Sequence, residues 1–63
     1  MQPHEALIGM RVKVLETDRR ADLRGKFGVI EDRFGHLEHV ALDVWLDDGR
    51  LELFWTHGLE KAE

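Results

Sequence analysis

The chain has 63 residues, no cysteine and a net charge of −4, from 13 acidic and nine basic side chains. This length allows one small domain that buries only about 60% of its unfolded surface, so its stability should be a few kcal/mol. The missing cysteines exclude disulfides, thiolate metal ligands and a cysteine nucleophile. No apolar run approaches the roughly 20 residues of a membrane span, so we expect a cytoplasmic protein without a membrane segment.

The N-terminal part of the chain predicts one helical turn and one strand. Pro3 to Ile8 is the only segment with a helical signal, because proline suits the first position of a helix; residues 1–8 are otherwise expected to be flexible. Met10 to Glu16 alternates apolar and basic side chains, which is typical of a half-buried strand. Arg11 and Lys13 lie on its outer face.

A polar loop and a glycine-rich strand follow. Residues 17–24 are dense in Asp and Arg and predict the loop. Gly25 to Glu31 predicts the second strand, and residues 33–36 predict a turn after it. Glycine inside a strand often marks a bulge or a bend. The pattern therefore leaves open whether Val29 or Ile30 points inward.

Residues 38–47 and 50–55 predict a β-hairpin, which is the most informative feature of the chain. Asp48-Gly49 is a preferred two-residue turn, because both central residues need positive φ. This turn would pair Leu46 with Leu51, and the side-chain period of two then assigns each residue to a face. The predicted inner face carries Leu42, Val44, Leu46, Leu51, Leu53 and Trp55. The predicted outer hairpin face carries Asp43, Trp45, Asp47, Arg50, Glu52 and Phe54.

The end of the chain completes an all-β domain spanning residues 1–63. Residues 56–58 predict a short turn, in which one 3-10 turn would fit, before a last strand at 59–61. Five short strands favour a closed or partly open barrel, because a flat sheet this small would leave edge strands with unpaired backbone groups that promote aggregation. The predicted core is Met10, Val12, Val14, Leu42, Val44, Leu46, Leu51, Leu53 and Trp55.

Two glycine-valine motifs resemble the SH3-like small barrels that contain a KOW-type element. Ile8-Gly9-Met10-Arg11-Val12-Lys13-Val14 is similar to the first strand of that element, and Gly25-Lys26-Phe27-Gly28-Val29-Ile30 to its second strand. The resemblance implies a five-stranded SH3-like barrel with a 3-10 turn before the last strand. Such barrels serve as RNA-binding modules, peptide binders, chromatin readers and subunits of complexes, so the resemblance alone does not select a function.

Trp45 and Phe54 are the first candidate site, because two aromatics share the predicted outer hairpin face. Exposed aromatic clusters often mark a partner surface, and Asp43 and Glu52 beside them would favour a cationic partner. We therefore expect a non-catalytic interaction module or accessory subunit that binds a protein. Two alternatives stay open: both rings belong to the core, or this face forms a homodimer.

A nucleic-acid-binding module of KOW type is the alternative function. The basic residues lie mainly in the first 33 residues, where seven Lys and Arg face six acids, whereas residues 34–63 carry a charge of −5. The acids interleaved in the loop and its lack of an aromatic for base stacking weaken this alternative. Its candidate residues are Arg11, Lys13, Arg19, Arg20, Arg24 and Lys26.

The sequence offers little support for catalysis or for a metal site. His36 and His39 are separated by two residues, a spacing that needs further ligands before it indicates a metal, and His4 and His57 lie elsewhere. Serine and tyrosine are absent, and neither Thr17 nor Thr56 has the context of a nucleophile. We expect no enzyme activity, no cofactor and no bound metal.

Overall fold

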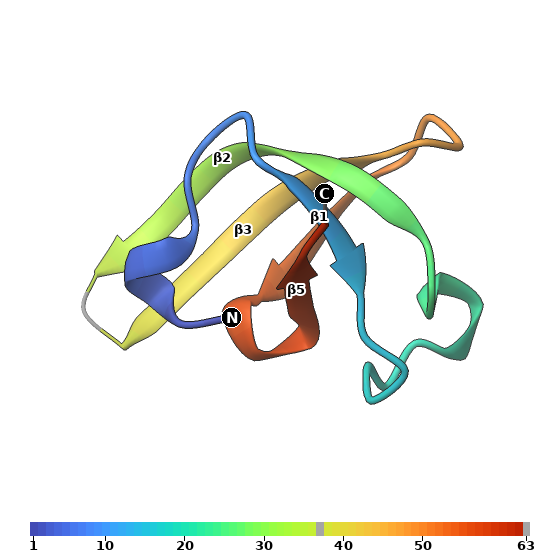
Figure 1. Ribbon diagram of the computed structural model, residues 1–63, viewed down its shortest axis with the longest axis horizontal. Coiled ribbons are helices and arrows are strands. Elements are labelled where there is room, and N and C mark those ends of the chain that lie inside the picture. The colour runs from blue at the N-terminus through green and yellow to red at the C-terminus, as the bar shows by residue number, and fades with distance from the viewer. Residues whose placement is uncertain (37, 63) are drawn as a thin grey trace.

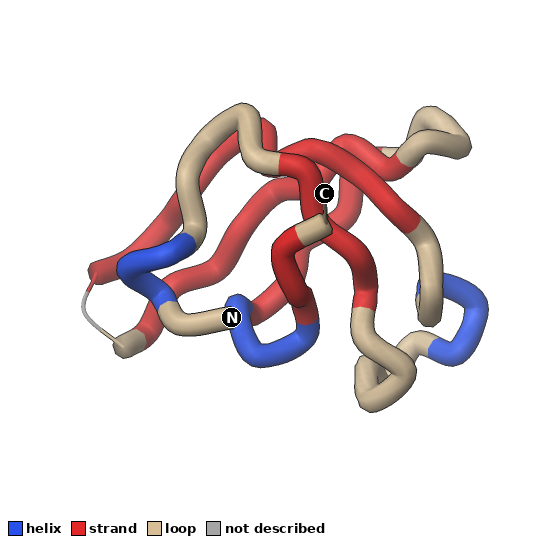
Figure 2. The backbone as a smooth tube through the Cα atoms, in the orientation of Figure 1, coloured by secondary structure: helices blue, strands red, loops and turns tan. Residues whose placement is uncertain are grey.

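Residues 1–36 and 38–62 are described by a computed structural model of the chain, in which one antiparallel sheet of five strands forms the framework (Figure 1). The all-β prediction is confirmed. The strands are β1 Arg11–Val14, β2 Phe27–His36, β3 His39–Leu46, β4 Leu51–Trp55 and β5 Leu59–Lys61. The 3-10 turns are η1 Pro3–Glu5, η2 Ala21–Leu23 and η3 Thr56–Gly58. Figure 2 shows η3 immediately before β5, as the sequence predicts.

The sheet curls but does not close into a barrel. Its strand order is β4-β3-β2-β1-β5, and no ladder among residues 1–36 and 38–62 joins β4 to β5. The N-terminal segment packs beside η3 and β5, where the Met1 ammonium donates to the carbonyl oxygens of Thr56 (3.0 Å) and Leu59 (2.6 Å). The predicted barrel closure is therefore not confirmed, and β4 keeps an open edge.

Strand β2 is longer than predicted. Residues Arg33 to His36, expected in a turn, pair with β3, so β2 continues to His36. The register shifts between Ile30 and Asp32, which makes Glu31 the extra residue of a β-bulge. Ile30 is buried and Val29 lies on the opposite face. Of the two residues, it is therefore Ile30 that points inward.

The turn between β3 and β4 differs from the prediction by one residue. Leu46 N–H donates to Arg50 O (2.8 Å), and Trp45 pairs with Leu51 rather than with Glu52. The connection therefore has three residues, 47–49, and Gly49 has φ +93°. A three-residue hairpin loop with a left-handed residue at its third position is a common alternative to the two-residue turn, and Asp-Gly is compatible with both.

This single-residue shift exchanges the two faces of β4, because the side-chain period is two. Phe54, predicted on the outer face, is buried with 1% exposure. Leu51, Leu53 and Trp55, predicted in the core, are 45%, 52% and 54% exposed. The assignment of β3 is confirmed: Leu42, Val44 and Leu46 are buried, and Trp45 is 45% exposed. The prediction for β4 is wrong throughout.

The core is one apolar cluster inside the curl of the sheet. Five of its members were predicted from the alternation of the first and third strands, and Met10 packs against it while partly exposed. The prediction missed residues in the N-terminal segment, in η2, in β2 and at the start of β3 and β5. The full cluster is Ala6, Val12, Val14, Leu23, Ile30, Val40, Leu42, Val44, Leu46, Phe54 and Leu59.

Gly28 lies at a close approach of β2 to β3. It is buried and pairs with Val12 on β1 and Leu46 on β3. A Cβ atom at this position would overlap the backbone oxygen of Trp45 and the side chain of Val44. The glycine in the predicted second strand therefore allows tight strand packing, whereas the bulge lies three residues further on.

Candidate functional site

The convex side of β2, β3 and β4 carries an ordered array of side chains that we name the outer sheet face. Cross-strand pairing arranges it in three rows, about 7 Å apart along the strands. The first row is Val29, Trp45 and Leu51, the second Asp32, Asp43 and Leu53, and the third Phe34, Ala41 and Trp55. Seven of these nine residues are apolar, so the face differs from the polar outer side usual for an antiparallel sheet.

The large apolar side chains of this face are well exposed. Phe34, Trp45 and Leu51 are each 45% exposed, Leu53 is 52% and Trp55 is 54% exposed. Strand β4 thus points its more apolar side toward solvent. On its other side Phe54 is buried and Glu52 is partly exposed. A contiguous exposed apolar patch of this kind is typical of an interaction surface.

Two carboxylates lie at the centre of the outer sheet face. Asp32 and Asp43 are directly opposite each other on β2 and β3. Neither forms an ion pair with any residue in the described part of the chain, and Asp32 accepts only the backbone N–H of Arg33 (2.8 Å). Like charges in directly opposite positions destabilise a sheet. The face therefore has uncompensated negative charge among aromatic rings.

The structure separates the four residues predicted as the protein-binding site. Trp45 and Asp43 lie on the outer sheet face, as predicted. Phe54 is in the core, and Glu52 lies on the same side of β4 as Phe54, 3.6 Å from Arg20. Phe54 and Glu52 do not belong to the outer sheet face because the hairpin register is shifted by one residue.

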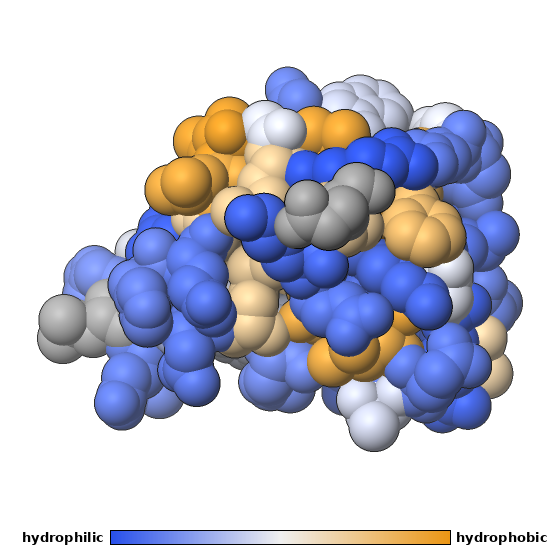
Figure 3. Space-filling model, in the orientation of Figure 1, coloured by the Kyte–Doolittle hydropathy of each residue, from blue (hydrophilic) through white to orange (hydrophobic). Residues whose placement is uncertain are grey.

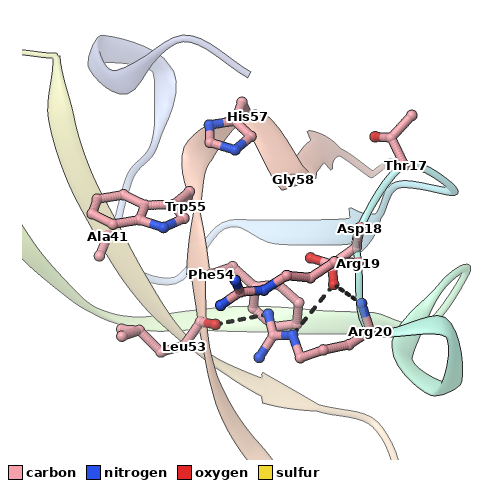
Figure 4. A pocket seen from close by; sticks show the side chains of 10 residues that line it. All are labelled: Thr17, Asp18, Arg19, Arg20, Ala41, Leu53, Phe54, Trp55, His57 and Gly58. Atoms are coloured by element: carbon pink, nitrogen blue, oxygen red, sulfur yellow. Dashed lines mark hydrogen bonds and ion pairs between the residues drawn. The ribbon is translucent and has the colours of Figure 1, made fainter.

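A cleft of about 550 Å³ adjoins the open edge of β4 (Figure 4). One wall is the loop from Thr17 to Arg20, and the other is formed by β4 and η3. Figure 4 shows Arg19 reaching from the loop across the cleft toward β4. Arg20 lies over the Phe54 ring, 4.4 Å from its centroid. The lining residues are Thr17, Asp18, Arg19, Arg20, Ala41, Leu53, Phe54, Trp55, His57 and Gly58.

Arg20 is held in the cleft by several contacts. Its Nη2 donates to Leu53 O (2.8 Å), and its backbone N–H donates to Asp18 Oδ1 (2.9 Å). Burial raises the pKa of Asp18, but the hydrogen bonds and charge of Arg20 outweigh it, so this pKa lies below its usual value. Arg19, in contrast, forms no hydrogen bond or ion pair within residues 1–36 and 38–62.

Several of the basic residues predicted for nucleic-acid binding have partners within the chain. Arg11 pairs with Asp47, and its hydrogen bond holds the pKa of Asp47 below its usual value. Lys26 pairs with Asp48 (3.2 Å), at the tip of the β3–β4 hairpin. Arg11 and Lys13 also lie over the Phe27 ring, at 5.5 and 5.8 Å from its centroid, and Arg24 donates to the loop carbonyl of Asp18 (2.5 Å).

Two further surface features are a pair of histidines and a second apolar patch. His36 and His39 face each other across β2 and β3, and both are exposed. No group of three metal-ligating side chains is present within the described residues. Figure 3 shows an apolar patch over the loop between η1 and β1, where Leu7 and Ile8 are 61% and 63% exposed.

Searches of protein-family models, of curated proteins and of solved structures found no match for this chain. Across residues 1–36 and 38–62, no helix has the length and apolar character needed to cross a membrane.

Proposed function

We propose that the protein is a non-catalytic interaction module that binds a protein partner through the outer sheet face. The observation that carries this proposal is the orientation of β4. Its more apolar side, with Leu51, Leu53 and Trp55, faces solvent, while the charged side chain of Glu52 shares the inner side with Phe54. Exposing the more apolar side costs stability, and docking of a partner would recover the burial.

The partner presents a cationic side chain to the centre of this face. Asp32 and Asp43 are the charged residues among the nine of this face, and neither has an ion-pair partner in the described chain. An arginine fits best, because its guanidinium binds carboxylates in pairs and stacks on aromatic rings such as Trp45. A second copy of this chain fits poorly, since a symmetric dimer would bring four carboxylates together.

Matched double variants test the proposal. Trp45→Ser with Leu51→Ser removes two apolar side chains from one row of the outer sheet face, whereas Leu7→Ser with Ile8→Ser removes two apolar side chains elsewhere that are even more exposed. Proteins captured from the source cell extract by the immobilised chain would be quantified for each variant, and the purified partner titrated by calorimetry. We expect a loss of affinity of roughly tenfold or more for the first variant only.

Two outcomes would contradict this function. The first is equal capture by the two double variants. The second is sedimentation analysis showing a dimer of the native chain that the Trp45→Ser, Leu51→Ser variant abolishes, because a second copy would then occupy the face. Circular dichroism checks that each variant is folded, which we expect because the substituted side chains are about half exposed. Asp43→Lys provides a charge test, since it should abolish binding of a cationic partner.

A further inference from the structure

The cleft between the Thr17–Arg20 loop and β4 offers hydrogen-bond donors that the chain itself does not use. Leu46 N–H donates to Arg50 O, which fixes the alternation of the β3–β4 ladder. By this alternation, the backbone groups of Leu53 and Trp55 point away from β3. Leu53 O accepts from Arg20, but the N–H groups of both residues have no acceptor within residues 1–36 and 38–62.

The side chains of the cleft add positive charge. Arg19 is exposed and crosses the cleft without an ion-pair partner in the described chain (Figure 4). Asp18 is the only acidic residue in the lining, and it is engaged by the backbone and side chain of Arg20. The groups left free are therefore donors and a cation, which together favour an anionic ligand.

We propose that this cleft binds an extended peptide segment through one carboxylate, which pairs with Arg19. The peptide backbone accepts hydrogen bonds from the free N–H groups of β4, in the manner of strand addition to a sheet edge. Trp55 and Leu53 supply the apolar contacts beside it. This inference goes beyond the docking function, because it requires neither Trp45 nor Leu51.

A peptide is favoured over single-stranded nucleic acid by the charge around the cleft. Trp55 offers a ring for base stacking, but the chain has a net charge of −4, and Glu52 lies 3.6 Å from Arg20. Nucleic-acid affinity depends on neutralising several phosphates in a row. One free arginine beside acidic residues suits a single carboxylate instead.

Fluorescence of Trp55 provides the assay, in a Trp45→Phe protein where it is the sole tryptophan. The probe is a pool of acetyl-X-X-Glu-X-X-amide pentapeptides, with X drawn from Val, Leu and Thr; the control pool has Gln in place of Glu. We expect saturable binding of the Glu pool, and binding weaker by roughly tenfold for the Gln pool or for Arg19→Gln. Lys61→Gln removes the positive charge of an exposed side chain on β5 and should change nothing.

Several results would overturn the inference. These are equal binding of the two pools, unchanged affinity of Arg19→Gln, no saturable signal up to about 1 mM peptide, or tighter binding of a uridine decamer than of the Glu pool. Amide NMR shifts at Leu53 and Trp55 check the strand pairing. Because Leu51→Ser weakens the proposed docking face without touching the cleft lining, retained peptide binding in that variant separates the two proposals.

Discussion

Truncation of Phe54 tests the hairpin register directly, because the two possible registers predict opposite results. Phe54 is 1% exposed, whereas its neighbour Leu53 is 52% exposed. Removing a fully buried phenylalanine costs about 3–5 kcal/mol. A half-exposed leucine contributes about half of the 1.5–3 kcal/mol of a buried one, so Leu53→Ala should cost about 1 kcal/mol. The register in the structure therefore predicts that Phe54→Ala lowers the free energy of unfolding severalfold more than Leu53→Ala does.

The cost at Phe54 is comparable with the total stability of the domain. At roughly 0.05–0.15 kcal/mol per residue, a chain of this length has about 3–9 kcal/mol in total. Phe54→Ala should leave much of the protein unfolded, so the milder Phe54→Leu, expected to cost up to about 1.5 kcal/mol, completes the series. Urea denaturation followed by tryptophan fluorescence measures all three variants. If Leu53→Ala were costly and Phe54→Ala nearly neutral, β4 would have the register of a two-residue turn.

Two glycines and one carboxylate provide further predictions. Gly28→Ala should lose about 1–3 kcal/mol or more, because its Cβ would overlap backbone on β3; Gly49→Ala, where no atom lies within 4 Å, should lose only the roughly 1–2 kcal/mol of backbone strain at φ +93°. Urea midpoints that rank these variants in reverse would contradict the packing at Gly28. Hydrogen bonds from the side chain and backbone of Arg50 lower the pKa of Asp48 from 3.8 to about 2. Because the folded pKa is depressed, this stabilisation is present above pH 3.8 and lost as the pH falls through about 2. In thermal melts, Asp48→Asn should therefore flatten the pH dependence across that window, and an unchanged profile would contradict the Asp48–Arg50 contact.

The alternation of side chains predicted the fold class and the buried side of β1 and β3. It failed for β4 because Leu51, Leu53 and Trp55 form the more apolar set, and a period of two assigns the more apolar set to the core. The loop length decides the outcome, and Asp48-Gly49 fits loops of two or three residues. Leu23 was missed because a single buried residue in a polar loop leaves no periodic signal.

The candidate sites depend on contacts that the sequence pattern could not supply. Trp45 and Asp43 were correctly placed because β3 follows its alternation, but Phe34, Leu53 and Trp55 joined them only through the observed register. The cleft brings loop residues beside β4, which follows them by more than 30 positions in the chain. The basic loop itself contains no aromatic residue, but Trp55 from β4 lines the same cleft as this loop.

The three-residue connection between β3 and β4 has a consequence for how this protein can evolve. Surface loops usually accept insertions and deletions freely. Deletion of one residue from positions 47–49, however, would exchange the inner and outer faces of β4. Leu51, Leu53 and Trp55 would enter the interior, and Phe54 would become surface. Point substitutions can adjust the outer sheet face gradually, whereas a single-codon deletion here would replace it in one step. Among descendants of this gene, we therefore expect the length of this loop to vary less than its amino acids.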